Sequence, residues 1–70
     1  MKFNNLKKIR KRKKLTQRNV SNLAGINERL YQNYEYGIVT PNVYTAMKIA
    51  DILNSNVYEC FPIHNNDNIK

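Results

Sequence analysis

The chain contains only one cysteine, Cys60, among its 70 residues, and it has no tryptophan. A single cysteine excludes an intramolecular disulfide, which fits a reducing compartment. No apolar run approaches the roughly 20 residues of a membrane-spanning helix, and no apolar signal core follows the basic N-terminus. These absences lead us to expect a complete, soluble, cytoplasmic chain with no membrane partner.

Catalytic and metal-binding constellations are lacking as well. The chain has one histidine, His64, in a polar segment near its end, and five acidic residues in total. Cys60 lies in an apolar segment with no evident base beside it, and no spacing typical of metal ligands is present. We therefore expect no enzymatic activity, no catalytic residue, no metal and no cofactor.

Negative charge is scarce, whereas positive charge is abundant and gathered at one end of the chain. The formal net charge is +7 and the sequence pI is about 9.8. Residues 1–18 hold nine of the 12 lysines and arginines and no acid. Such a density of like charge repels itself unless a polyanion neutralises it, so the pattern favours nucleic-acid binding over a solvated helix face. Three lysines of this segment are expected to contact phosphates: Lys11, Lys13 and Lys14.

Two other interpretations of the basic segment fit less well. A helix lying on a membrane surface would need a broad apolar face, and residues 1–15 offer only a thin one. RNA binding is compatible with the charge, but the sequence contains neither a strand pattern suited to an RNA-binding sheet nor a GXXG loop.

Apolar residues recur at helical spacing along most of the chain, which predicts an all-α fold of five short helices. Thr16 and Asn27 are suited to cap the second and third helices, and Asn4 or Asn5 the first. Gly25 suits the left-handed position at the end of the second helix. The expected helices span about 4–14, 17–24, 28–35, 43–53 and 56–61.

The same spacing assigns inward-facing residues to each expected helix. Phe3 packs back onto the first helix, and Tyr44, Met47 and Tyr58 pack either in the core or in a dimer interface. The expected buried faces consist of Leu6, Ile9, Val20, Leu23, Ala24, Leu30, Tyr31, Tyr34, Val43, Ala46, Met47, Ile49, Ala50, Leu53, Val57, Cys60 and Phe61.

The segment from Gln17 to Glu35 is typical of two helices that cross steeply around a tight turn. Small or apolar residues stand where such helices touch, at Val20, Ser21 and Ala24, followed by the turn residue Gly25. A large residue at Ser21, or a β-carbon at Gly25, is expected to force the helices apart. An ordinary helical hairpin in a bundle would show a similar pattern, but the neighbouring basic segment favours a helix-turn-helix that sits on DNA.

The run LKKIRKRKKLTQ…LAGIN…YEYG…TPN…MKIADILN, over about residues 3–61, resembles the Cro/C1-type (XRE) helix-turn-helix domain of phage repressors and small bacterial regulators. The resemblance implies a five-helix bundle of the lambda-repressor-like type, whose helix-turn-helix is formed by helices 2 and 3. It also implies that the third helix lies in the major groove of operator DNA, usually in a dimer. We accordingly expect a domain over residues 1–62 and a polar tail over 63–70, in which Ile63 and Ile69 offer an edge strand or a dimer contact.

Three positions depart from the family pattern, and the first, Ser21 in place of the usual alanine, is harmless. Tyr31 stands where isoleucine or valine is common, so it must either enlarge the core or turn its hydroxyl towards the DNA backbone. Glu28 stands where a polar or basic residue is common, which affects the base preference rather than the fold.

Base-reading roles are expected at the start of the third helix, since that end of a recognition helix points at base edges. Arg29 can bond both O6 and N7 of guanine, Glu28 can accept from cytosine N4, and Gln32 can pair with adenine. Glu28 is explained equally well as an acid stabilised by the helix dipole, and Arg29 also suits a non-specific phosphate contact. The expected base-reading residues are Asn27, Glu28, Arg29 and Gln32.

Phosphate contacts are expected where helix N-termini and loop donors face the backbone. Gln17 and Arg18 begin the second helix, where amide groups and the dipole favour an anion, and the resemblance implies a phosphate contact at Gln17. It further implies a buried ion pair between Arg10 and Glu35. With the three lysines above, the expected phosphate contacts are Gln17, Arg18, Asn33, Tyr36, Thr40 and Asn42.

The sequence thus predicts a sequence-specific DNA-binding transcriptional regulator, and specifically a repressor associated with the nucleoid. Its expected partners are double-stranded DNA with a near-palindromic operator and a second copy of the chain. No small-molecule ligand is expected. The alternative is an antitoxin-like or other protein-interaction module whose DNA binding is autoregulatory, and an exposed apolar patch within residues 55–70 would favour it.

Overall fold

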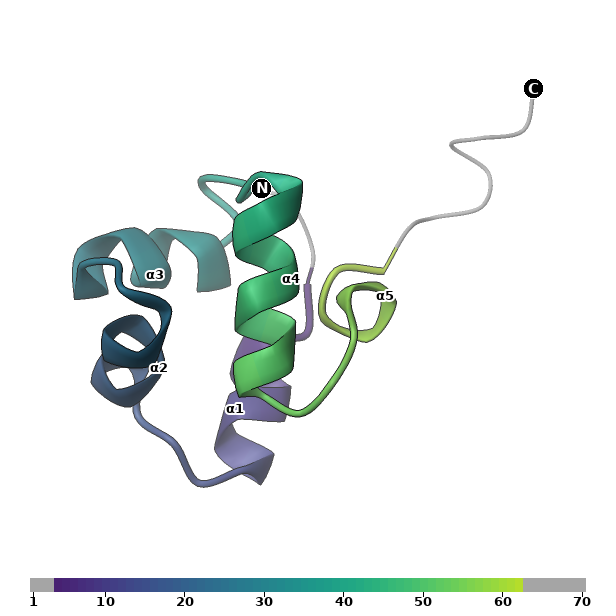
Figure 1. Cartoon of the computed structure of the whole chain (residues 1–70), viewed down its shortest axis with the longest axis horizontal. Coiled ribbons are helices and arrows are strands. Elements are labelled where there is room, and N and C mark those ends of the chain that lie inside the picture. Colours follow the sequence, from purple (N-terminus) through teal and green to yellow (C-terminus); the bar gives the residue numbers. More distant parts are fainter. Residues whose placement is uncertain (1–3, 63–70) are drawn as a thin grey trace.

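A computed structural model of the protein describes residues 4–62, which fold into five helices around one core (Figure 1). The expected all-α, five-helix architecture is confirmed. Phe3 and the tail 63–70, with Ile63, His64 and Ile69, lie outside the described residues. The helices are α1 (Leu6–Arg12), α2 (Gln17–Ala24), α3 (Glu28–Glu35), α4 (Val43–Ile52) and α5 (Val57–Cys60).

Side-chain caps set where the helices begin. Thr16 caps α2 through a reciprocal pair of hydrogen bonds: its hydroxyl accepts from the Asn19 amide at 2.9 Å, and the Asn19 side chain accepts from the Thr16 amide at 3.0 Å. The side chains of Asn27, Asn42 and Asn56 each accept from an amide three residues further on, at the starts of α3, α4 and α5. Each cap supplies an acceptor for an amide that has no partner within its own helix, which is why α2 and α3 begin where the sequence predicts.

The first helix is shorter than the expected 4–14. It begins at Leu6, whose amide donates to the Asn4 side chain at 3.0 Å, while Asn5 occupies the cap position without a side-chain cap bond. It ends at Arg12 because Lys14 adopts a left-handed conformation with φ 61°. A continued helix would need a negative φ there.

The turn between α2 and α3 is made at Gly25, which ends α2 with φ 73°. The Ile26 amide then donates to the Ser21 carbonyl at 3.0 Å, which closes the end of the helix. A β-carbon on Gly25 would meet only the Lys48 Nζ, at an ordinary 3.9 Å. The expectation that such a β-carbon would force the helices apart is therefore wrong. Glycine is favoured because its backbone tolerates the positive φ.

The core lies between α1, α2, α3 and α4, and α5 closes one side of it. Ser21 is 1% exposed and Tyr31 is fully buried, so a small residue of α2 and a large one of α3 both reach the interior. Tyr31 therefore enlarges the core, the first of the two alternatives considered for it. The apolar core consists of Leu6, Ile9, Val20, Ala24, Tyr31, Tyr34, Ile49, Ala50, Leu53 and Cys60, with Leu15, Ile26, Leu30, Ile52, Val57 and Phe61 packed against it.

Three residues expected in the core are instead exposed: Leu23 by 62%, Val43 by 73% and Met47 by 58%. On α2 the buried face is formed by Val20, Ser21 and Ala24, and Leu23 lies about 200° round the helix from Ser21. On α4 the inner face is occupied by Ala46, Ile49, Ala50 and Leu53, and Met47 lies about 100° round the helix from Ala46. The apolar stripe of α4 is thus wider than the surface that the bundle can cover.

Figure 1 shows how these helices divide the molecule: α4 crosses in front of α1, α2 and α3 lie together on one side, and α5 lies on the other. Among residues 4–62, no helix has the length and apolar character needed to span a membrane.

Candidate nucleic-acid interface

Helices α2 and α3 pack against each other and present the start of α3 at the surface. Asn27 fixes that start, because its side chain accepts from the Leu30 amide at 2.8 Å. Arg29 follows in the first turn and is exposed. The described part of the chain contains two ion pairs, and neither involves Arg29. The exposed beginning of α3 is therefore available to contact a flat or grooved partner.

A buried ion pair joins α1 to the end of α3. Arg10 Nε lies 2.6 Å from Glu35 Oε2, and the side chains are 8% and 1% exposed. A second guanidinium nitrogen donates to Glu35 Oε1 at 3.2 Å, and the third donates to the Leu15 carbonyl at 2.9 Å. Burial by itself raises the pKa of Glu35, but hydrogen bonds from Arg10 and Gln17, together with the nearby Tyr31 hydroxyl, outweigh it and hold the pKa below its usual value. The pair fixes the end of α3 relative to α1.

Gln17 and Gln32 extend this ion pair into a chain of hydrogen bonds. The Gln17 amide donates to Glu35 Oε1 at 3.1 Å, and the Gln32 amide donates to the Gln17 side-chain carbonyl at 3.2 Å. Both glutamines were expected to contact DNA, and both are half-buried with side chains engaged inside the protein. To bind adenine, the Gln32 side-chain amide would have to break its hydrogen bond to Gln17, or use one N–H for Gln17 and the other for the base.

Tyr31 lies next to this network. Its hydroxyl is buried and forms no hydrogen bond of good geometry within the described residues. Burial raises the pKa of the phenol, and the nearby negative charge of Glu35 raises it further. The phenol therefore remains neutral, and it lies inside the bundle rather than towards a DNA backbone.

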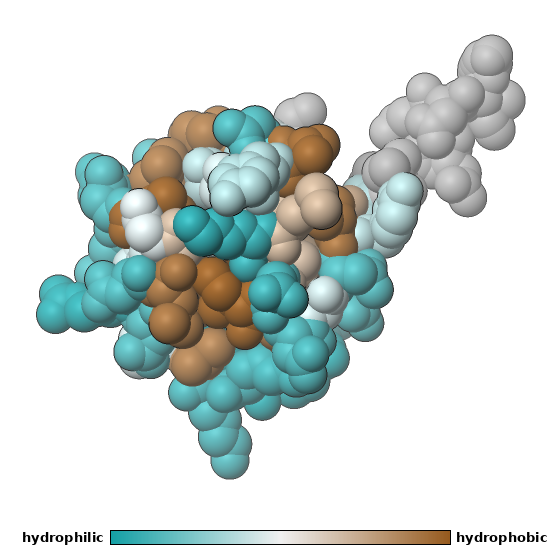
Figure 2. Space-filling model, in the orientation of Figure 1, coloured by the Kyte–Doolittle hydropathy of each residue, from teal (hydrophilic) through white to brown (hydrophobic). Residues whose placement is uncertain are grey.

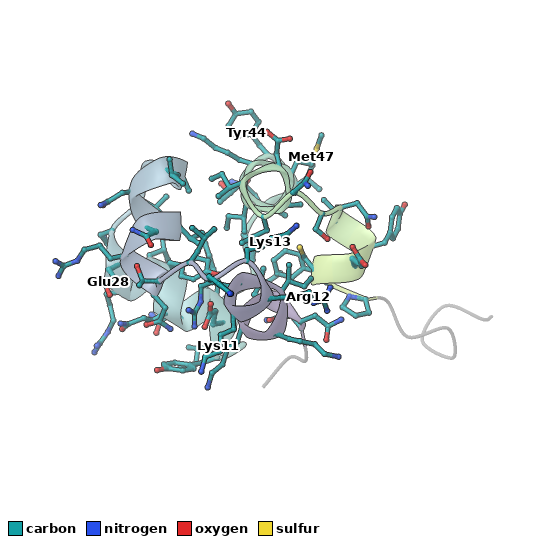
Figure 3. The ribbon with its side chains drawn as sticks, turned by 90° about the horizontal axis from the view of Figure 1, so that it is seen from below. Lys11, Arg12, Lys13, Glu28, Tyr44 and Met47 are labelled. Atoms are coloured by element: carbon teal, nitrogen blue, oxygen red, sulfur yellow. The ribbon has the colours of Figure 1, made fainter. Side chains whose placement is uncertain are left out.

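An exposed ion pair links the beginnings of α2 and α3. Arg18 Nε lies 3.3 Å from Glu28 Oε1, and the two side chains are 76% and 36% exposed. Figure 3 shows Glu28 at the outer edge of the helix pair. Two residues expected to contact DNA separately, one at phosphate and one at a base, thus contact each other in the free protein.

Comparison with known proteins now places the chain in a family. The family model described as helix-turn-helix matches residues 6–59. The chain belongs to this helix-turn-helix family. The resemblance to Cro/C1-type domains is confirmed.

A curated relative is similar over 50 residues with 46% identity. It is the uncharacterized HTH-type transcriptional regulator YqaE of Bacillus subtilis (strain 168). The match covers 71% of this chain but 43% of the relative, so the chain spans less than half the length of that protein. The similarity therefore concerns the helix-turn-helix domain.

The loop after α3 presents several of the expected phosphate contacts of the helix-turn-helix domain. Tyr36 is 50% exposed, and Thr40 is exposed as well. The Asn42 side chain already caps α4, accepting from the Thr45 amide at 2.9 Å. Asn33 is half-buried, and its backbone carbonyl accepts from the amides of Ile38 and Val39, which folds the loop back onto α3.

The basic residues of α1 are all exposed except Arg10, but they do not share one face. Lys11 and Lys13 are two residues apart and therefore lie about 200° apart around a helix. Figure 3 shows Lys11, Arg12 and Lys13 pointing in three different directions from α1. The structure thus spreads this charge around the end of α1 rather than gathering the lysines in one line.

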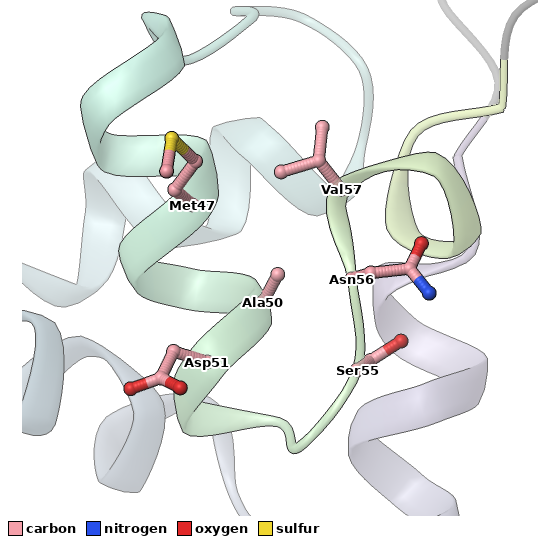
Figure 4. A pocket seen from close by; sticks show the side chains of 6 residues that line it. All are labelled: Met47, Ala50, Asp51, Ser55, Asn56 and Val57. Carbon is pink, nitrogen blue, oxygen red and sulfur yellow. The ribbon is translucent and has the colours of Figure 1, made fainter.

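The helix-turn-helix domain has a second surface, which was not predicted from the sequence as one continuous face. Large apolar side chains are exposed on α4 and α5, and a shallow hollow runs between the two helices (Figure 4). Figure 2 shows hydrophobic residues in patches across the side from which α4 is seen, and Figure 3 shows Tyr44 and Met47 pointing away from α1. The feature of the sequence that indicates this surface is the apolar stripe of α4, which is wider than the area that the other helices cover. We call this surface the α4–α5 face and define it by Val43, Tyr44, Met47, Val57 and Tyr58.

Proposed function

We propose that this protein is a sequence-specific transcriptional repressor that inserts α3 into the major groove of its operator. The observation that carries the proposal is the exposed start of α3, with Arg29 in its first turn, held on a bundle that belongs to the helix-turn-helix family. An α-helix fits the width of the major groove, and its N-terminal end is the part that reaches base edges. A repressor of this kind acts sterically, because the bound protein occupies DNA that polymerase needs.

Base reading is assigned to the residues at the start of α3. Arg29 contacts guanine O6 and N7 through its two-pronged guanidinium, and Glu28 accepts from cytosine N4. Asn27 keeps its capping bond and offers its side-chain amide to the groove. Gln32 contributes only if its amide is released from Gln17. We place the non-specific contacts at the exposed cations and hydroxyls, and these set affinity rather than base preference. They are Lys11, Lys13, Lys14, Tyr36 and Thr40, with Asn33, Asn42 and the N-terminus of α2 at Gln17 adding polar groups.

We further propose that the repressor is a homodimer joined through the α4–α5 face. Two copies of a chain with net charge +7 repel each other, so contact is favoured where the charge is low. Residues 43–60 carry one cation, Lys48, and two acids, Asp51 and Glu59. The face is also turned to a different side of the molecule from Glu28 in Figure 3, which leaves α3 free. A dimer of this kind would present two recognition helices about 34 Å apart to a near-palindromic operator.

The proposed function is tested by selecting bound duplexes from a random library and then comparing the selected duplex with a shuffled one over a range of salt. We expect the selected duplex to bind more tightly, with a preference that persists as salt rises. Arg29→Ala should reduce the preference by about 1–3 kcal/mol. Lys14→Ala should weaken binding to both duplexes equally and reduce the salt slope by about 1. Equal binding of the wild-type protein to both duplexes would contradict sequence-specific function.

A second candidate is an antitoxin-like module that uses the α4–α5 face to bind a different protein. The observation that favours it is the 74% exposure of Tyr58, which lies in the segment where an apolar patch was predicted to indicate such a role. The two candidate functions predict different oligomeric states for the purified protein. Sedimentation at micromolar concentration should give a dimer for the homodimeric repressor and a monomer for the module that awaits another partner.

A further inference from the structure

We infer that Arg18 is a positioning residue for Glu28, rather than a phosphate contact, and that the two act as one unit in selecting a base pair. This inference rests on the proposed function, because it concerns how the start of α3 reads DNA. It assigns to Arg18 a role in base preference, although the residue itself touches no base.

The position of Arg18 in its helix needs a compensating charge. Arg18 is the second residue of α2, and the N-terminus of a helix carries a partial positive charge. A cation is therefore disfavoured there unless an anion lies close by. Glu28 supplies that anion from the first position of α3, with its Oε1 at 3.3 Å from Arg18 Nε.

The negative charge of Glu28 in turn needs the positive charge of Arg18 close by when the protein binds DNA. A carboxylate that enters the major groove passes between two rows of phosphates, which repel it. Within the described residues Arg18 is the one cation paired with this carboxylate. With its charge compensated, Glu28 can approach the cytosine N4 donor and will be disfavoured opposite the acceptors of guanine or thymine.

The backbone holds both partners in place before DNA arrives. The capping box of Thr16 and Asn19 fixes the start of α2, and Ser21 is fixed by donating its hydroxyl to the Arg18 carbonyl at 3.0 Å. The cap at Asn27 fixes the start of α3. The Arg18 side chain is 76% exposed and the Glu28 side chain 36%, so the pair lies at the surface, where DNA can reach it. Such an exposed ion pair contributes little to the stability of the fold. We therefore expect its main effect to be on DNA binding.

The test is a double-mutant cycle on the duplex selected by the wild-type protein, with Arg18→Ala and Glu28→Gln made singly and together. We expect Arg18→Ala to weaken binding on the order of tenfold in the wild-type background but less than about twofold beside Glu28→Gln. Arg18→Ala should also change the base preference at one position of each half-site when the selection is repeated. Arg12→Ala is the matched control, since Arg12 is exposed and forms no ion pair among the described residues. It should have the same effect in both backgrounds and leave the preference unchanged.

Equal losses for Arg18→Ala in both backgrounds, with an unchanged selected sequence, would overturn the inference and make Arg18 a phosphate contact. The proposed function would survive that outcome. If the wild-type protein selects no sequence at all, the proposed function fails and the inference fails with it. Thermal unfolding of each variant excludes loss of fold as the cause, because both side chains are at the surface and should not shift the midpoint appreciably.

Discussion

At the scale of single residues, the chain places its polar groups in two contrasting environments. Arg10 and Glu35 form a buried pair that accepts and donates several hydrogen bonds, whereas Arg18 and Glu28 form an exposed pair at the surface. Breaking a buried pair on one side leaves a charge without compensation, which is costly. The same change in an exposed pair costs little because water replaces the partner. The first pair therefore serves the fold, and the second is free to serve recognition.

Acid should unfold the protein partly through Glu35. The folded pKa of this carboxyl lies below its unfolded value of about 4.3, so its contribution to stability is present above that pH and is lost as the pH falls through the folded pKa. Glu35→Gln should cost about 3–5 kcal/mol at pH 7, because it leaves Arg10 buried without an anion. Its stability should also fall less than that of the wild-type protein below about pH 4.3. Urea denaturation at several pH values measures both effects. Asp51→Asn, at an exposed acid, is the control and should retain the acid dependence.

At the scale of the elements, short-range rules set the limits of the helices. Thr16 and Asn27 begin α2 and α3 through caps within three residues, and Gly25 ends α2 through its own backbone conformation. These interactions involve neighbours in the chain, so their positions can be predicted from the sequence. The end of α1 could not be predicted in this way, since no residue type announces the positive φ of Lys14.

The turn at Gly25 should be sensitive to conformation rather than to volume. Gly25→Ala should destabilise the domain by about 1–2 kcal/mol, because alanine resists a left-handed backbone. Gly25→Asn should cost less, although asparagine is larger, because it tolerates that conformation. The midpoints of urea denaturation give the comparison. A larger loss for asparagine than for alanine would show that space, not φ, limits this position.

At the scale of the whole molecule, the basic segment and the α4–α5 face are different parts of the chain. The cations are concentrated in residues 1–18, and the large exposed apolar side chains of α4 and α5 form the α4–α5 face. A basic protein must avoid its own positive field when it associates with itself, and this face offers a route to do so. The proposed dimer and the proposed DNA contact therefore use different parts of the surface.

The dimer should depend on Met47, which lines the hollow between α4 and α5. Met47→Glu should weaken self-association on the order of tenfold or more, since it places a charge in the apolar centre of the contact. Ile38→Glu is the control, because Ile38 is similarly exposed at 65% but lies in the loop after α3. Sedimentation over a concentration series measures the effect. An unchanged distribution of species for Met47→Glu would place the interface elsewhere.

The sequence by itself determined the presence and order of five helices, the caps of α2 and α3, the turn at Gly25 and membership of the helix-turn-helix family, because these depend on residue types at short, regular spacings. Only the tertiary structure decided which apolar residues remain exposed, since a stripe such as that of α4 does not reveal how much of it neighbouring helices cover. The tertiary structure also decided which polar groups meet. Gln17 contacts Glu35, and Arg18 contacts Glu28, across 18 and 10 residues of chain. Residue spacing along the chain does not determine whether residues so far apart meet. The packing of α2 against α3 determines it.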